Sequence, residues 1–330
     1  MSGIRRLVQL SFVEPYLFSS MWSLSVDAFN TQNSFSAYST QQTGAGLALG
    51  HPVFHRQLRL ALRYSADRTT LGSTTTALFS NSAQGAQAQQ RLPFRNQQLS
   101  GRTSALRLSL TWDSRDNRIF PTKGIYASVS TESADPYIGS ERTFWRHRYF
   151  GRFYYPLIFG MVLRLNTEAG LVTSRKPSGV PLYERFFLGG ILSVRGFPFQ
   201  GLGPRADTPL TIDPNGGRTS QGVRLGGNAM LRMNLELEFP ILNAVGIKGV
   251  IFTDAGNVWN LEKTICEANP NPTLDPSQKV CGFNKLRFSY GAGVRWFSPM
   301  GPLRFEWGFP IAPRSYDDKV RFEFTIGQFF

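Results

Sequence analysis

Apolar and polar residues alternate strictly along much of the chain. The clearest runs cover residues 106–113, 287–296, 303–309 and 322–330. In the first of them, leucines at every second position are separated by Arg107, Ser109 and Thr111. Successive side chains of a β-strand point to opposite faces, so a period of two gives each strand one apolar and one polar face. The pattern therefore predicts an all-β protein.

The alternation predicts thirteen strands. They cover residues 5–12, 22–29, 44–50, 57–65, 103–113, 124–132, 144–155, 161–170, 227–239, 246–259, 285–297, 302–309 and 320–330. Several match the roughly 9–11 residues that a tilted strand needs to cross a bilayer. In a soluble sandwich the apolar face would point into the core, whereas in a membrane barrel it would point to lipid. The alternation alone leaves both architectures open.

The predicted connections between strands alternate in length. Short connections cover residues 13–21, 51–56, 114–123, 156–160, 240–245 and 298–301, the long ones cover 66–102, 171–226 and 260–284, and 30–43, 133–143 and 310–319 are intermediate. Outer-membrane barrels have short periplasmic turns at one end and longer loops at the other. Aromatic residues also gather near strand ends, as a girdle at the membrane interface requires. These residues are Trp22, Trp112, Tyr154, Tyr155, Trp259 and Trp296. Together the two features favour an antiparallel transmembrane β-barrel over a soluble sandwich.

Composition excludes several other classes of protein. The chain has 32 Gly and 20 Pro, which would interrupt helices. No stretch approaches the roughly 18 uninterrupted apolar residues of a transmembrane helix. The net charge of +14 comes from Arg and Lys spread along the chain rather than from a patch, which argues against nucleic acid as a partner.

The beginning of the chain raises a question of completeness. Residues 1–6 lead into strand-like alternation in place of the apolar segment of a secretory signal peptide. Single-chain bacterial barrels have an even number of strands, with both ends in the periplasm. An odd number of strands would place Met1 outside the cell if the carboxyl end is periplasmic. We therefore expect residues 1–330 to be one barrel domain that lacks its amino-terminal part.

Several short motifs carry a resemblance to a known family. The longest predicted loop contains VRGF at 194–197, and GGNAM at 226–230 leads into the next strand. FTDAGNVW at 252–259 and MGPLR at 300–304 follow in order. These motifs resemble the barrel domain of the BamA-type outer-membrane insertase family, over nearly the whole chain. The resemblance implies a sixteen-stranded barrel preceded by periplasmic POTRA domains, of which this chain would hold strands four to sixteen and no POTRA domain.

For VRGF, the resemblance implies a loop folded back into the barrel, with Arg195 gripping the inner wall. Glu236 and Glu238 alternate with leucines, so both carboxylates should face the lumen, and Asp254 lies on the next strand. A guanidinium can bridge carboxylates of adjacent strands bidentately. The candidate lock residues are Val194, Arg195, Gly196, Phe197, Glu236, Glu238 and Asp254. The alternative is an ordinary solvated loop arginine, with carboxylates that balance an arginine-rich lumen.

The residue types do not favour an enzyme. Glu236 and Glu238 could act as a glycosidase pair, but carboxylates are common in a polar lumen and no other feature indicates a sugar site. A lipase-like or protease-like barrel needs a nucleophile beside a histidine. His51 and His55 fall in a predicted short turn, and no serine lies in a GxSxG motif. We therefore expect no catalytic, cofactor-binding or metal-binding residues.

The two cysteines and the last strand carry two further predictions. Cys266 and Cys281 flank a Pro- and Asn-rich stretch within one predicted external loop, where an oxidising compartment favours a disulfide. The last strand resembles the aromatic-ended signal of barrel substrates and would form one side of a weakly paired seam. Its residues in this role are Phe322, Phe324, Ile326, Gly327 and Phe330.

The resemblance implies a protein of the outer membrane of a Gram-negative-type bacterium that folds and inserts other β-barrel proteins. Its implied partners are unfolded barrel clients, accessory assembly lipoproteins and outer-membrane lipid, and no cofactor is implied. A polypeptide translocator of the same superfamily, of the two-partner-secretion or TamA-like type, is the alternative. A passive porin, which would lack a VRGF-type lock, is a third class.

Overall fold

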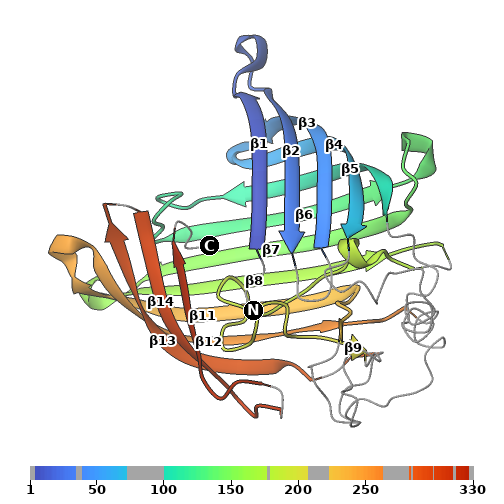
Figure 1. The fold of residues 1–330 in the computed structure, drawn as a ribbon. Coiled ribbons are helices and arrows are strands. Elements are labelled where there is room, and N and C mark those ends of the chain that lie inside the picture. The colour runs from blue at the N-terminus through green and yellow to red at the C-terminus, as the bar shows by residue number, and fades with distance from the viewer. Residues whose placement is uncertain are drawn as a thin grey trace, which may run out of the picture.

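Thirteen of the described strands form one antiparallel sheet in chain order (Figure 1). The computed structural model describes residues 4–34, 39–72, 100–176, 179–206, 223–262, 282–283, 285–299, 301–314 and 317–326. The sheet comprises β1 (Ile4–Glu14), β2 (Ser23–Ser34), β3 (Ser39–Val53), β4 (His55–Gly72), β5 (Ser100–Asp113), β6 (Gly124–Ala134), β7 (Phe144–Pro156), β8 (Val162–Thr173), β11 (Ala229–Leu242), β12 (Ile247–Trp259), β13 (Arg287–Ser298), β14 (Gly301–Pro310) and β15 (Arg321–Ile326). The thirteen predicted strands are thus confirmed.

Strand lengths differ from the prediction mainly in β3 and β4. These strands pair from Ser39 opposite Gly72 down to a turn at Phe54. His51 and His55 therefore lie in strands, and their assignment to a turn was wrong. The ends of both strands near Ser39 and Gly72 carry polar residues on both faces. The backbone hydrogen bonds continue there although apolar and polar residues no longer alternate, which is why the sequence did not predict these ends.

The remaining elements are short. A two-stranded ribbon of β9 (Arg205–Ala206) and β10 (Val223–Arg224) was not predicted. Single-turn 3-10 helices are η1 (Leu17–Ser19), η2 (Pro136–Ile138), η3 (Ile158–Gly160), η4 (Leu182–Glu184) and η6 (Asn243–Val245). Within the described part of the chain, no helix is long and apolar enough to cross a membrane.

The two faces of the sheet are the reverse of those of a soluble sandwich. On β11, Met233 and Leu235 point outward and are each 41% exposed, whereas Glu236 and Glu238 point inward and are each 2% exposed. A sandwich would bury the leucine face between two sheets. The apolar outer surface and the charged inner surface are those of a transmembrane β-barrel. The predicted fold class is therefore confirmed.

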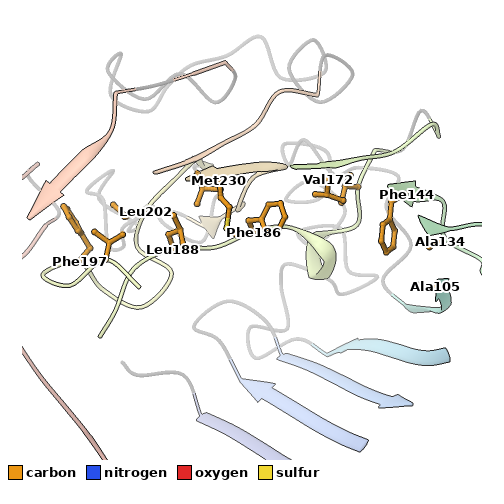
Figure 2. Packing of buried hydrophobic residues seen from close by; sticks show 12 residues of the cluster. Ala105, Ala134, Phe144, Val172, Phe186, Leu188, Phe197, Leu202 and Met230 are labelled. Carbon is orange, nitrogen blue, oxygen red and sulfur yellow. The ribbon is translucent and has the colours of Figure 1, made fainter. Parts of the chain in front are cut away.

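Buried apolar residues gather inside the curved sheet rather than between two sheets. Phe186, Leu188, Phe197 and Leu202 come from the long connection between β8 and β11 (Figure 2). They pack against wall residues such as Met230. Apolar contacts therefore fix this connection against the inner face of the sheet, and these contacts position the VRGF motif.

The turn between β5 and β6 is held by one carboxylate. Asp116 Oδ2 accepts a hydrogen bond from Thr122 Oγ1 at 2.6 Å, and its Oδ1 accepts from the backbone N–H groups of Thr122 and Lys123 at 3.0 and 3.2 Å. Burial opposes ionisation, but these hydrogen bonds outweigh it and lower the pKa of Asp116 from 3.8 to about 2. The ionised carboxylate therefore stabilises the folded turn above pH 3.8 and loses this effect as the pH falls towards 2.

We expect Asp116→Ala to lower the free energy of unfolding by about 1 kcal/mol at pH 7, since the exposed turn loses net hydrogen bonding. The loss should shrink at pH 2.5, where the wild-type carboxylate is becoming protonated. Urea unfolding of both proteins at the two pH values measures it. Asn117→Ala is the matched control, because the Asn117 side chain accepts from Ile119 N at 2.8 Å and does not titrate. An equal loss at both pH values for Asp116→Ala would contradict the assignment.

Candidate functional site: an ion-pair cluster in the lumen

The VRGF motif lies at the tip of a hairpin-like loop that folds back into the lumen. Leu188 and Leu202 form an isolated β-bridge, and Gly190 N donates to Phe197 O at 3.0 Å, so the loop closes on itself. Gly196 has a φ of 83°, a left-handed conformation that glycine adopts without steric cost. The turn at Gly196 presents the neighbouring Arg195 to the wall.

Arg195 makes a dense set of charged contacts. Its Nε and a terminal nitrogen donate to the two oxygens of Asp254 at 2.7 and 2.6 Å, and its backbone N donates to the same carboxylate at 2.9 Å. Its other terminal nitrogen donates to Glu236 at 2.6 Å and to Glu306 at 3.2 Å. The guanidinium also lies 3.5 Å from the centre of the Phe252 ring. One loop residue thus joins three strands, β11, β12 and β14.

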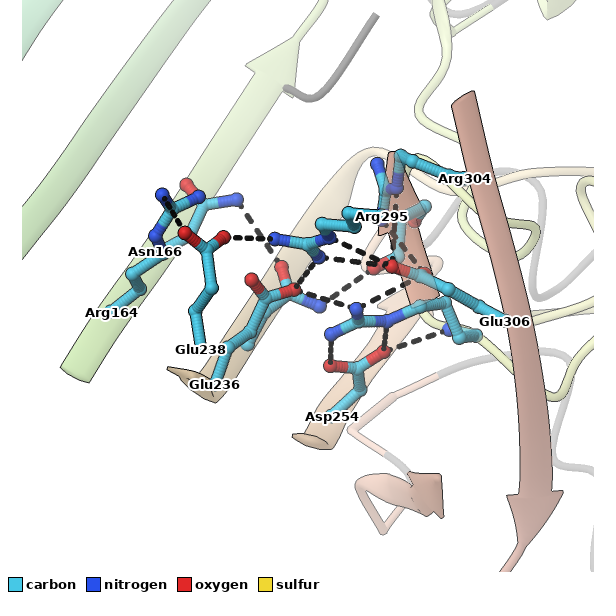
Figure 3. Close-up of polar contacts among 11 residues, drawn as sticks. Arg164, Asn166, Glu236, Glu238, Asp254, Arg295, Arg304 and Glu306 are labelled. Atoms are coloured by element: carbon cyan, nitrogen blue, oxygen red, sulfur yellow. Dashed lines mark hydrogen bonds and ion pairs between the residues drawn. The ribbon is translucent and has the colours of Figure 1, made fainter. Parts of the chain in front are cut away.

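A second arginine extends the cluster around the wall (Figure 3). Arg295 on β13 is fully buried and donates to Glu236 and Glu306 at 2.9 Å each, and to Glu238 at 3.3 Å. Arg304 donates to Glu306 at 2.8 Å. The ion-pair cluster comprises Arg164, Arg195, Glu236, Glu238, Lys248, Asp254, Arg295, Arg304 and Glu306. It spans five neighbouring strands, β8, β11, β12, β13 and β14.

Two of the three predicted carboxylates contact Arg195 and one does not. Asn234 lies opposite Asp254 in the β11–β12 register, and Glu236 is the next inward residue, so Glu236 and Asp254 meet the guanidinium together. Glu238 is one inward position further along β11. It accepts instead from Arg164 and Lys248 at 2.9 Å each, as well as from Arg295. It therefore belongs to the cluster without touching the loop.

The other two VRGF side chains are apolar anchors. Val194 and Phe197 are both fully buried in the cluster of the lumenal loop. The guanidinium of Arg287 on β13 lies 4.9 Å from the centre of the Phe197 ring. Each residue of the motif thus has a defined contact or conformation at the wall.

Sequence reasoning missed Glu306, Arg295 and Arg304. Their parity was visible, because each alternates with apolar residues and so faces inward. The sequence does not reveal which strands the tip of the loop contacts. Those contacts depend on the curvature of the sheet and on where the apolar part of the loop packs.

The last strand pairs with β14 from Arg321 opposite Gly308 to Ile326 opposite Leu303. Phe322, Phe324 and Ile326 are exposed on the outer face. Phe322 and Phe324 pack beside Trp307 and Phe305, with ring centres 5.1 and 4.9 Å apart. β1 and β15 are the two edges of the sheet as described. Gly327 and Phe330, like Cys266 and Cys281, lie outside the described residues.

The cluster is suited to holding a loop rather than to acid–base chemistry. The carboxylates of Glu236, Asp254 and Glu306 all accept charge-assisted hydrogen bonds from guanidinium groups that are themselves buried. Among the described residues, no group of three or more His, Cys, Asp or Glu side chains is placed to hold a metal ion.

Comparisons with known proteins agree with this architecture. The chain is 27% identical to the outer membrane protein assembly factor BamA of Neisseria meningitidis over an alignment of 349 positions, gaps included, which covers 97% of this chain and 41% of that protein. It is 31% identical to BamA of Nitratidesulfovibrio vulgaris over 230 residues, 69% of this chain and 26% of that protein. The chain thus spans less than half of either relative.

A solved structure of BamA from Haemophilus ducreyi lacking POTRA domains 1–3 superposes with a TM-score of 0.77 at 26% identity, covering 97% of this chain and 61% of the other. The family model described as the Omp85 superfamily domain matches residues 1–330. The chain therefore belongs to the Omp85 superfamily.

Proposed function

We propose that the chain is the membrane barrel of an outer-membrane protein assembly factor, which folds and inserts β-barrel proteins. The observation that carries the proposal is the lumenal loop clamped by Arg195 to Asp254, Glu236 and Glu306. The names of the relatives, both assembly factors, support the same function.

The proposed location is the outer membrane, in contact with lipid. The outward apolar residues supply the lipid-facing band. Rings also meet at one rim, where the ring centres of Trp22 and His51 lie 4.7 Å apart and those of His55 and Trp112 lie 6.1 Å apart. Amphipathic rings at a rim are typical of a membrane interface.

The proposed mechanism uses strand pairing and needs no catalytic residue, cofactor or nucleotide. An edge strand exposes a row of backbone donors and acceptors, to which an unfolded client strand can pair. β15 supplies such an edge, and the ion-pair cluster stiffens the wall of β11 to β14 beside it. Unfolded barrel proteins are the proposed clients, and accessory lipoproteins are the proposed partners.

The test is insertion of an unfolded client barrel into liposomes that contain the complete protein. We expect insertion to be faster than into empty liposomes and to slow when Arg195→Glu places a carboxylate among the carboxylates of the wall. Protease protection of the client measures insertion, and Arg118→Glu is the matched control because the Arg118 side chain is 86% exposed. Equal rates with and without the wild-type protein would refute the proposed function.

A further inference from the structure

Arg287 connects the loop tip to the last hairpin of the sheet. It begins β13, is buried, and stacks its guanidinium on Phe197 of the VRGF motif at 4.9 Å. A terminal nitrogen of the same guanidinium donates to Asp317 Oδ2 at 2.6 Å and to Ala312 O at 3.5 Å. Both acceptors lie in the connection between β14 and β15. Arg287 therefore touches the loop tip on one side and the last hairpin on the other.

Asp317 also organises the connection in which it lies. The carboxylate oxygen that binds Arg287 also accepts from Arg314 N at 2.8 Å, and Asp317 N donates to Arg314 O at 2.9 Å. The Asp317 side chain is 1% exposed. A buried carboxylate is costly unless it is paired, so loss of Arg287 would favour a rearrangement of this connection.

The loop tip also touches β14 directly. A Cβ added at Gly308 would lie 2.4 Å from Gly196 N and 3.0 Å from Arg195 C, so the backbones approach too closely for any side chain. Glu306, two residues earlier on β14, accepts from Arg195 at 3.2 Å. The VRGF tip thus meets the last hairpin at the body of β14 and, through Arg287, at the β14–β15 connection.

We propose that Arg287 and Asp317 form a latch through which the VRGF tip holds β15 in register on β14. The pair acts through Phe197 and the β14–β15 connection, so both are positioning residues. When the latch opens, the connection loosens and β15 frays from β14. The inference rests on the proposed function in one respect, because β15 is the edge to which a client strand would pair.

Hydrogen exchange of the complete protein in its membrane tests the latch. Asp317→Asn keeps the shape of the side chain and weakens a charge-assisted hydrogen bond. We expect the amides of β15 that pair with β14 to exchange about tenfold faster, corresponding to about 1.4 kcal/mol. Asp318→Asn is the matched control, because the Asp318 side chain is 50% exposed and pairs with Arg321 at the surface. The amides of β6, far from the latch along the sheet, should not change in either variant.

A second variant distinguishes loss of the Arg287–Asp317 pair from a general destabilisation of the barrel. Reversing both charges, with Arg287→Asp and Asp317→Arg in one chain, should bring the exchange of β15 back towards wild type relative to either single change. Equal exchange of β15 in Asp317→Asn and Asp318→Asn would overturn the latch. Client insertion by Asp317→Asn is measured in parallel, and we expect it to be slower. Fast β15 exchange with unchanged insertion would uphold the latch and contradict the proposed use of the β15 edge.

Discussion

Arg195→Ala is expected to release the lumenal loop and to lower the free energy of unfolding by about 3–5 kcal/mol. The reason is that the carboxylates of Asp254, Glu236 and Glu306 all accept hydrogen bonds from this guanidinium. Its removal leaves buried negative charge that Arg295 and Arg304 offset only in part. Denaturant unfolding in detergent and heat-modifiable gel mobility measure the effect.

Two further variants show whether the loss of stability comes from the bidentate hydrogen bonding of Arg195 or from the removal of any arginine. Arg195→Lys keeps the charge but cannot form the bidentate pair with Asp254, so its stability should fall between those of wild type and Arg195→Ala. Arg118→Ala, at an exposed turn position, should leave stability within about 0.5 kcal/mol of wild type. Unchanged gel mobility and unchanged client assembly after Arg195→Glu would contradict the hypothesis that Arg195 holds the lumenal loop on the inner wall.

Arg295→Leu is expected to lower the free energy of unfolding by a similar amount, about 3–5 kcal/mol, because it removes a buried cation from the wall of the sheet. Arg295 is fully buried and binds Glu236, Glu238 and Glu306. Leucine fills part of the space but leaves these three carboxylates with fewer donors. Unfolding in denaturant, monitored by the loss of the strand signal in circular dichroism, gives the change in free energy.

The coupling between the two arginines offers an independent check. Arg195 and Arg295 share Glu236 and Glu306, so the cost of removing both should differ from the sum of the single costs by more than about 0.5 kcal/mol. Strict additivity would mean that the cluster does not act as a unit.

The fold was predictable because one local signal, the period of two, determines both strand positions and side-chain direction. Leu235 and Glu236 illustrate this, since adjacent letters in the sequence become the outer and inner surfaces of the wall. The signal failed where both faces are polar, as at Thr40 to Thr43 in β3. There the backbone ladder persists without any contrast between the two faces.

Only those residues of the candidate site could be predicted that belong to a recognisable motif or alternate with apolar residues along a strand. Glu236 and Asp254 are inward residues of adjacent strands, and the structure places both on Arg195. Glu306 lies 111 positions after Arg195 in the chain, and nothing local indicates that the loop tip would cross to its strand. Gly308 is similar, since the need for a missing side chain arises only from the approach of Gly196.

The expectation that the barrel lacks an amino-terminal part stays a prediction, as does the Cys266–Cys281 disulfide. An immunoblot of source-cell outer membranes addresses the first of these. A band well above the 37.0 kDa of this chain would agree with a longer protein. A band at that mass would contradict it.

Depletion of the protein in its source cells, followed by quantitative proteomics of the outer membrane, tests the proposed function most directly. An assembly factor acts on many clients, so we predict that β-barrel proteins as a class fall in the outer membrane and accumulate unfolded in the periplasm. A translocator would instead lose one secreted polypeptide from the medium. Undiminished barrel proteins together with loss of a single secreted protein would contradict the account.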